Sequence, residues 1–124
     1  MFIEFQFADD LCTLRCQGRF EAGDDLDYLE SKIAELRSLR PVYLLVDFQQ
    51  VSSIGSTGLG FLVCAYKIVT GNAGGKFVLA GPNPRVRHIL DLTRLSSVIP
   101  VAKDVESGLA ALGGVCAPKA VARQ

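Results

Sequence analysis

The residues with the clearest chemical potential lie in the hydroxyl- and glycine-rich segment VSSIGSTGLG, at positions 51–60. An apolar run precedes this segment and an apolar stretch with helical spacing follows it, so we expect a polar loop over residues 49–56 and then a helix over about 57–69. Ser56 then caps the helix, with its hydroxyl near unpaired backbone N–H groups and the positive end of the helix dipole. A phosphate on Ser56 would be stabilised there. The pattern alone favours the simpler interpretation, in which Ser56 only caps the helix and the glycines only permit a tight turn.

Two catalytic interpretations of the sequence are weaker. Ser56, His88 and Asp91 are the residues that could form a hydrolase triad, but GSTG is not the G-x-S-x-G motif of serine hydrolases. The stretch GNAGGKF at 71–77 lacks the spacing of a Walker loop and has Phe77 where a serine or threonine would hold magnesium. We therefore interpret this stretch as a turn, place His88 on a helix surface and predict no catalytic residues.

The cysteines raise the question of a disulfide or a metal site. Cys12 and Cys16 lie in an expected strand, where residues four apart share a face but are roughly 13 Å apart, too far for a disulfide. With Cys64, Cys116, a single histidine and no CxxC motif, the chain offers no usable zinc ligand set. We expect the cysteines to serve as small core hydrophobes, and we predict no metal and no cofactor.

The composition is that of one globular domain. The chain has 124 residues, 49% of them hydrophobic, and its 13 basic residues equal its 13 acidic ones, so no overall field attracts nucleic acid or an anionic membrane. No apolar stretch is long enough to span a bilayer, and the N-terminus MFIEFQFADD carries acids where a signal peptide carries basic residues. We expect a cytoplasmic protein without direct nucleic-acid or membrane contact.

The first half of the chain predicts a hairpin, a helix and a buried strand. Apolar and polar residues alternate over 2–7 and 11–17, as in two half-buried strands joined by a tight turn. Apolar residues then fall at helical spacing from Leu26 to Leu36. The almost unbroken apolar run 42–48 is typical of a strand covered on both faces.

The second half predicts alternating strands and helices. Residues 76–80 form a strand, and Asn83 then caps a helix whose first residue is Pro84. A short strand over 98–101 and a helix from about Asp104 to Gly113 and Gly114 complete the domain. The order ββαβαβαβα predicts an α/β fold with a mixed, mostly parallel sheet of four to five strands, an N-terminal β-hairpin and helices mainly on one face.

The helix after Ser56 has two apolar faces. One face carries Leu59, Leu62, Val63 and Tyr66, and the other carries Phe61, Ala65 and Ile68. One face can pack on the sheet while the second meets a partner, or neighbouring loops can bury both. An exposed Phe61 would favour the partner.

Two long stretches of the sequence resemble a known family. DFQQVSSIGSTGLGFLVCAYK, at 47–67, is similar to the signature of STAS-domain anti-sigma factor antagonists, and KFVLAGPNPRVRHILDLTRLSSVIPVAKDVESGLAAL, at 76–112, is similar to the closing half of that family. The resemblance covers nearly the whole chain and implies a STAS-type fold. We expect the STAS domain to span residues 1–114 and residues 115–124 to form a mobile C-terminal tail.

The resemblance assigns roles to individual residues. Ser56 matches the phosphorylatable serine of the family, and Glu21 stands where the family usually has an acidic residue near the same surface. Gly55 is a departure, because an aspartate is usual before the acceptor. The partner-binding residues that the resemblance implies are Glu21, Ser53, Gly55, Ser56, Thr57, Gly58 and Phe61.

The family's mechanism implies a bacterial, non-enzymatic partner switch. The unmodified protein would bind an anti-sigma factor that is also a serine kinase, phosphorylation of Ser56 would break the complex, and a phosphatase would restore it. The chain would be a monomer or a weak homodimer. The alternative is another use of the same fold, as a subunit of a lipid-transport ABC ATPase or of a sensory complex, without a phosphorylation cycle.

Overall fold

A five-stranded mixed sheet forms the centre of the protein. The computed structural model describes residues 2–8, 11–20, 26–40 and 42–112. Within them the strands follow the order β1-β2-β3-β4-β5, each beside its neighbour in the sequence. The first two strands are antiparallel and the others are parallel, as the sequence predicts. The strands are β1 Phe2–Ala8, β2 Leu11–Phe20, β3 Tyr43–Ile54, β4 Lys76–Ala80 and β5 Val101–Ala102.

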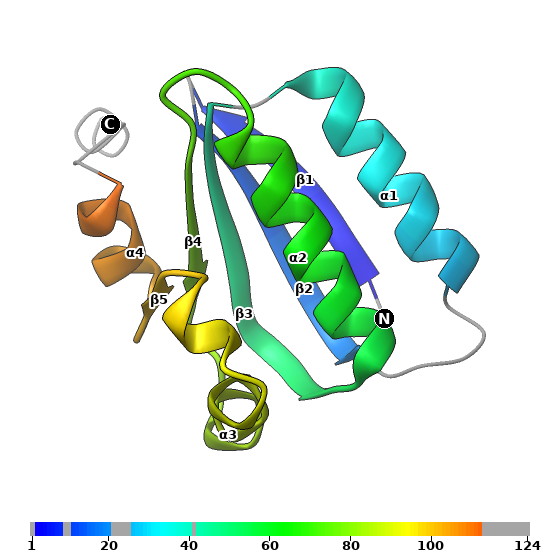
Figure 1. The fold of residues 1–124 in the computed structure, drawn as a ribbon, viewed down its shortest axis with the longest axis vertical. Helices are drawn as coiled ribbons and strands as arrows, with labels where there is room; N and C mark the ends of the chain where they lie inside the picture. Colours follow the sequence, from blue (N-terminus) through cyan, green and yellow to red (C-terminus); the bar gives the residue numbers. More distant parts are fainter. Residues whose placement is uncertain (1, 9–10, 21–25, 41, 113–124) are drawn as a thin grey trace.

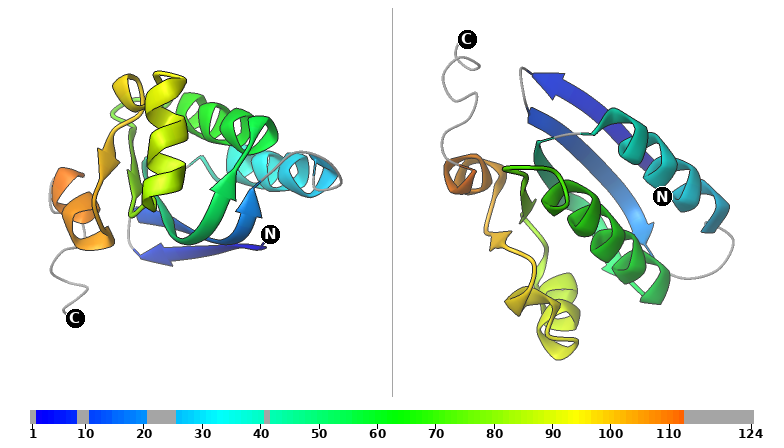
Figure 2. Two further views of the ribbon diagram at one scale, coloured as in Figure 1. Left: turned by 90° about the horizontal axis from the view of Figure 1, so that it is seen from below. Right: turned by 45° about the horizontal axis from the view of Figure 1, so that its top comes forward.

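Helices cover the two faces of the sheet unequally. The α-helices are α1 Leu26–Leu39, α2 Ser56–Thr70, α3 Pro84–Leu92 and α4 Val105–Ala111, and a 3₁₀ turn spans Leu95–Ser97. The ribbon views show α1, α2 and α3 on one side of the sheet and α4 on the other (Figures 1 and 2). The helices therefore lie mainly on one face, as expected from the sequence.

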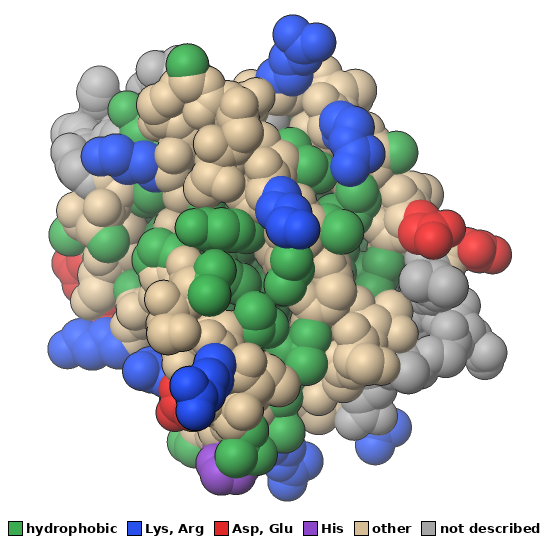
Figure 3. All heavy atoms as spheres, in the orientation of Figure 1, with side chains coloured by type: hydrophobic (Ala, Val, Ile, Leu, Met, Phe, Trp, Pro, Cys, Tyr) green, Lys and Arg blue, Asp and Glu red, His purple; other side chains and the backbone are tan. Residues whose placement is uncertain are grey.

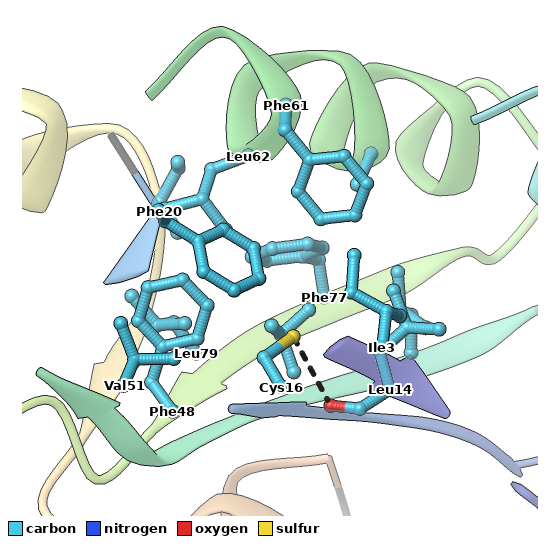
Figure 4. Close-up of a cluster of buried hydrophobic side chains, with 14 of the residues drawn as sticks. Ile3, Leu14, Cys16, Phe20, Phe48, Val51, Phe61, Leu62, Phe77 and Leu79 are labelled. Carbon is cyan, nitrogen blue, oxygen red and sulfur yellow. Dashed lines mark hydrogen bonds between the residues drawn. The ribbon is translucent and has the colours of Figure 1, made fainter. Parts of the chain in front are cut away.

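The central strand β3 is buried on both faces. Its Leu44, Val46 and Phe48 belong to the larger core beneath α1, α2 and α3, whereas Leu45 belongs to a smaller core that Leu112 also joins. This alternation explains why the run 42–48 is almost entirely apolar, since each side chain has a layer to pack against. Figure 4 shows part of the larger core, where the ring of Phe61 points from α2 toward the sheet beside Phe20.

The predicted loop over 49–56 is wrong. Strand β3 continues to Ile54, because the extended end of β2 pairs with it from Gln17–Gln50 to Phe20–Ile54, with one register shift between Gly18 and Arg19. Val51 and Ile54 are buried on this extension. Only Gly55 separates β3 from α2, so the segment 49–56 is a direct strand-to-helix junction rather than a loop.

The predicted strand over 98–101 is also misplaced. The chain forms the 3₁₀ turn Leu95–Ser97, and Arg94 before it has a left-handed backbone with φ of 65°. Strand β5 therefore starts only at Val101 and has two residues. The sequence shows four apolar or β-compatible residues in a row, but Val98 is exposed and takes no part in the sheet.

The cysteines divide between the core and the surface. Cys12 and Cys16 are buried and unpaired, as predicted, whereas Cys64 on α2 is exposed, contrary to the prediction. Glu21, Cys116, the hairpin turn and the tail expected at 115–124 lie outside the described residues. In the described part of the chain no helix has the length and apolar character needed to cross a membrane.

Candidate functional site

The junction of β3 and α2 is held by main-chain hydrogen bonds. The N–H of Gly55 donates to the carbonyl of Phe20 at 2.7 Å, which ties the junction to the end of β2. The carbonyl of Gly55 accepts from the N–H of Leu59 at 2.9 Å and so starts the helix. Gly55 has extended backbone angles, φ −126° and ψ −165°, which other residues also adopt. The direction in which α2 leaves the sheet is therefore fixed.

The prediction that Ser56 caps α2 is wrong. Gly55 is the N-cap, and Ser56 is the first residue inside the helix, with an exposed side chain. The sequence expectation fails by one position because the carbonyl of Gly55 already accepts a helical hydrogen bond from the N–H of Leu59, which makes Gly55 the N-cap. Within the described residues the N-cap of α2 therefore makes no side-chain hydrogen bond to the first N–H groups, and Ser56 is exposed at the positive end of the helix dipole.

Two of the predicted partner-binding residues lie beneath this surface. Ser53 is 8% exposed. A Cβ on Gly58 would lie 2.5 Å from the Phe20 carbonyl oxygen and 2.8 Å from Cγ1 of Ile54, so only glycine lets the first turn of α2 pack this closely on the sheet. Gly58 acts by positioning Ser56 and the partly buried Thr57 above it.

Phe61 is a core residue and not an exposed contact. It is 4% exposed, and its ring packs edge-on against Phe20 with centroids 6.1 Å apart. The ring of Phe20 packs in turn on Phe48 at 5.3 Å. The exposed second face of α2 that would favour a partner at Phe61 is therefore absent, and the aromatic chain instead anchors α2 over the ends of β2 and β3.

Asn83 ties α3 to the same edge of the sheet. Its side-chain oxygen accepts from the N–H of Val86 at 2.8 Å, as expected for an N-cap. Its amide nitrogen also donates to the carbonyls of Val51 and Ser52, at 3.1 and 3.2 Å. The sequence indicates the cap through the Asn-Pro pair, but it contains no signal for the tether to β3, which joins residues more than thirty positions apart.

Nothing in the described residues adds metal or thiol chemistry to the junction. No group of three or more potential metal ligands comes together among them. Burial raises the pKa of the Cys12 thiol to about 11, and burial together with the nearby Asp47 carboxylate raises the pKa of Cys16 above its ordinary range. Both thiols therefore stay protonated and unreactive at neutral pH.

A groove of about 450 Å³ lies between α1 and α2 and ends at the candidate site. Ser56 and Thr57 line it together with Phe61 and Cys64 from α2, and Leu29, Ile33 and Arg37 contribute from α1. Hydrophobic side chains reach the surface between the two helices in the space-filling view (Figure 3). Sequence reasoning missed this groove because α1 and α2 are separated by a whole strand, and their pairing appears only in the fold.

The mixed five-stranded sheet with its helices is a STAS-type fold. The STAS domain family matches residues 3–108, and the chain belongs to this family. This assignment confirms the resemblance of the 47–67 and 76–112 stretches.

Several solved structures share the fold. An anti-sigma factor antagonist from Mycobacterium paratuberculosis has a TM-score of 0.79 and 23% identity, over 90% of this chain and 92% of that one. The phosphorylated form of the Bacillus cell fate determinant SpoIIAA has a TM-score of 0.63 and 16% identity, over 85% and 95%. A sulfate transporter family protein from Wolinella succinogenes has a TM-score of 0.64 and 15% identity, over 84% and 85%. These likenesses establish a common fold.

Proposed function

We propose that this protein is an anti-sigma factor antagonist that binds an anti-sigma factor with serine kinase activity and is switched off by phosphorylation of Ser56. The observation that carries the proposal is the exposed Ser56 in the first turn of α2, beside an N-cap, Gly55, that has no side chain to cap the helix. The similarity to an anti-sigma factor antagonist and to SpoIIAA in its phosphorylated form supports it.

The start of α2 suits a reversible phosphate for electrostatic reasons. Phosphoserine adds about −1.5 to −2 charge, and the N–H groups and dipole of the first turn stabilise that charge without refolding the helix. A partner docked over Ser56 would have to desolvate the phosphate and oppose its charge. A coupling of about 1 to 3 kcal/mol lowers the affinity of the partner by roughly 5 to 150-fold, which is enough for a switch.

The contact surface would be centred on the junction. Ser56 is exposed, and Gly55 and Thr57 are partly exposed beside it, so among the described residues of the predicted partner-binding set these three are accessible to a partner. Ser53, Gly58 and Phe61 support them from below. Glu21 follows the end of β2, to which Gly55 is bonded, and would extend the surface. The cycle would run in the bacterial cytoplasm, with a phosphatase that restores the unmodified form.

Phosphorylation is tested directly by incubating the protein with candidate anti-sigma kinases and ATP and locating the phosphate by mass spectrometry. We expect the phosphate on Ser56 and its loss in Ser56→Ala. Ser52→Ala is the matched control, because Ser52 is also exposed and near the junction but lies on β3. Phosphate on Ser52 or Thr57 in place of Ser56 would contradict the assignment.

Partner binding is tested with the same variants. Ser56→Asp should abolish binding of the anti-sigma kinase while Ser56→Ala and Ser52→Ala retain it, measured by calorimetry with the purified partner. The proposed switch fails if Ser56→Asp and Ser56→Ala both bind every partner as tightly as the parent.

That result would favour the second candidate, a constitutive STAS subunit of a lipid-transport ABC ATPase or of a sensory complex. The specific observations behind this candidate are Gly55 in place of the aspartate usual in the family and the fold shared with a sulfate transporter family protein. Co-purification of the protein with a transporter ATPase, independent of ATP and of Ser56, is its expected signature.

A further inference from the structure

The groove between α1 and α2 has the properties of a small-molecule site. Its volume of about 450 Å³ falls within the range of roughly 300 to 1,000 Å³ that ligand sites occupy. Leu29, Ile33 and Ala34 line one wall and Phe61 and Cys64 the other, so the interior is mainly apolar. The walls are two regular helices that run side by side in the same direction (Figure 1), and they hold the groove open.

Gly60 provides a second, independent observation. It lies in the interior of α2, where glycine costs about 0.5 to 1 kcal/mol relative to alanine. A Cβ on Gly60 would meet nothing within 4 Å, so packing does not require a glycine at this position, in contrast to Gly58 two residues earlier. Gly60 lines the groove, and any side chain there would occupy it. The glycine keeps the groove accessible at the expense of helix stability.

The charged residues make the two ends of the groove differ in charge. Glu30 and Arg37 line it from α1 and lie seven positions apart, or about 10 Å along the helix. Among the described residues the ion pairs are Lys32–Glu35 and Arg87–Asp91, so Arg37 and Glu30 are unpaired in that part of the chain. In Figure 3 basic side chains lie over the upper ends of α1 and α2, and acidic ones lie over the lower half of α1.

The Arg37 end suits a carboxylate better than the Glu30 end suits a cation. The guanidinium of Arg37 can bind a carboxylate through two parallel hydrogen bonds. At the other end, the positive pole of the α2 dipole lies at Ser56 and offsets the charge of Glu30, so a cationic head group gains little there. An apolar groove that is lined at one end by Arg37, which has no ion pair among the described residues, matches an amphiphile with an anionic head.

We infer that the α1–α2 groove binds a free medium-chain alkyl carboxylate, with its carboxylate on Arg37 and its chain along Ile33, Gly60 and Phe61 toward Ser56. The chain end would then lie beneath the surface that we propose for the anti-sigma partner, and the ligand would compete with any partner side chain inserted there. The described residues that line the site all belong to α1 and α2, and the inference stands whether or not Ser56 is phosphorylated.

Binding is tested on the full chain with dodecanoate, below its micelle concentration, by calorimetry and by the rate at which iodoacetamide alkylates Cys64. A Cys116→Ser background leaves Cys64 as the reactive thiol, because Cys12 and Cys16 are buried. We expect one dodecanoate per chain and at least a fivefold slower alkylation of Cys64 in its presence. Absence of binding, or binding that leaves the Cys64 rate unchanged, would overturn the site.

Three variants locate the ligand. Gly60→Leu fills the groove and should weaken dodecanoate binding at least tenfold without lowering the melting temperature, and Ala34→Phe should do the same from the opposite wall. Lys67→Leu is the matched control, because it adds a leucine to the exposed surface of α2 outside the groove and should bind as the parent does. Equal binding by Gly60→Leu, Ala34→Phe and the parent would show that dodecanoate binds elsewhere.

The head group is tested by exchanging it. Arg37→Gln should weaken dodecanoate binding by about tenfold, as expected for a charged hydrogen bond, and leave dodecanol binding unchanged. Dodecylamine should bind more weakly than dodecanoate. Equal binding of all three amphiphiles, unaffected by Arg37→Gln, would contradict the assigned orientation. If Gly60→Leu abolished binding of an anti-sigma partner while dodecanoate bound nowhere, the groove would be a protein-docking site and the inference would be wrong.

Discussion

Helices α2 and α3 differ in whether a side chain caps the free backbone N–H groups of their first turn. Both helices follow the carboxyl end of a parallel strand, β3 for α2 and β4 for α3. At α3 the Asn83 side chain accepts from the Val86 N–H and also holds two carbonyls of β3. At α2 the N-cap is Gly55, which has no side chain to offer, and Ser56 is left exposed.

The difference separates a structural helix start from one that can be modified. A side-chain cap contributes about 0.5 to 2 kcal/mol, and α4 has one as well, in Asp104. Helix α2 does without this contribution because its burial is deeper, with Phe61, Leu62 and Ala65 in the core. The helix that carries the proposed phosphorylation site is thus stabilised from below and left open at its N-terminus.

The largest effect is expected where α2 touches the sheet. Gly58→Ala should lower the free energy of unfolding by about 3 kcal/mol, because the new methyl group overlaps the Phe20 carbonyl and Ile54. Gly60→Ala is the matched control on the same helix and should raise it by about 0.5 to 1 kcal/mol, since nothing lies near the added methyl group. Urea denaturation measures both. Equal effects from the two substitutions would show that backbone entropy, and not contact with the sheet, governs this turn.

The second largest effect is expected at the start of α3, where Asn83 caps the helix. Asn83→Ala should destabilise the protein by about 2 kcal/mol, because it removes both the cap of α3 and the two hydrogen bonds to β3. Asn83→Asp keeps an oxygen for the Val86 N–H but loses the donor to Val51 and Ser52, so it separates the two contributions. If Asn83→Asp were as stable as the parent, the tether to β3 would contribute nothing.

The starts of α2 and α3 also show which helix boundaries can be predicted from the sequence. Asn83 and Pro84 predict the start of α3 correctly, because capping is chemistry between neighbours in the chain. The sequence places the start of α2 one residue too late, because the hydroxyl of Ser56 is typical of an N-cap, whereas Gly55 takes that position. Pairing of the 50–54 segment with β2 decides the outcome, and that pairing joins residues far apart in the sequence.

The same limit applies to the candidate site. Ser56 and its exposure follow from the motif, and the order of elements follows from periodicity. The burial of Phe61 could not be predicted, since both faces of α2 are apolar and only the fold places Phe20 and Phe48 beneath one of them. The groove beside Ser56 needs α1, whose position depends on the whole sheet.

A single substitution can give the start of α2 a side-chain cap like the one at the start of α3. Gly55→Asp places a carboxylate at the N-cap, where the extended backbone accepts any residue, and restores the residue usual in the family. We expect the free energy of unfolding to rise by about 0.5 kcal/mol, since aspartate exceeds glycine at this position only modestly. Kinase assays on the same variant should show faster phosphorylation of Ser56. A fall in stability would mean that the angles at Gly55 do not allow a cap.

The smallest effect distinguishes the neutral cap of α3 from the charged cap of α4. The N–H of Ser107 donates to the Asp104 carboxylate at 2.7 Å, and this bond lowers the pKa of Asp104 below its ordinary value. A lowered pKa in the folded state means that the cap contributes fully to stability above the ordinary aspartate pKa and that its contribution is lost as the pH falls through the lowered value.

Asp104→Asn keeps a cap that does not titrate, so its melting temperature should fall less than that of the parent between neutral and acid pH. Asp91→Asn is the control for position, because a hydrogen bond from Ser96 lowers the pKa of Asp91 on α3 without a cap being involved. If only Asp91→Asn flattened the acid limb of the curve, the charge on Asp104 would be irrelevant to its cap, and α4 would start as α3 does.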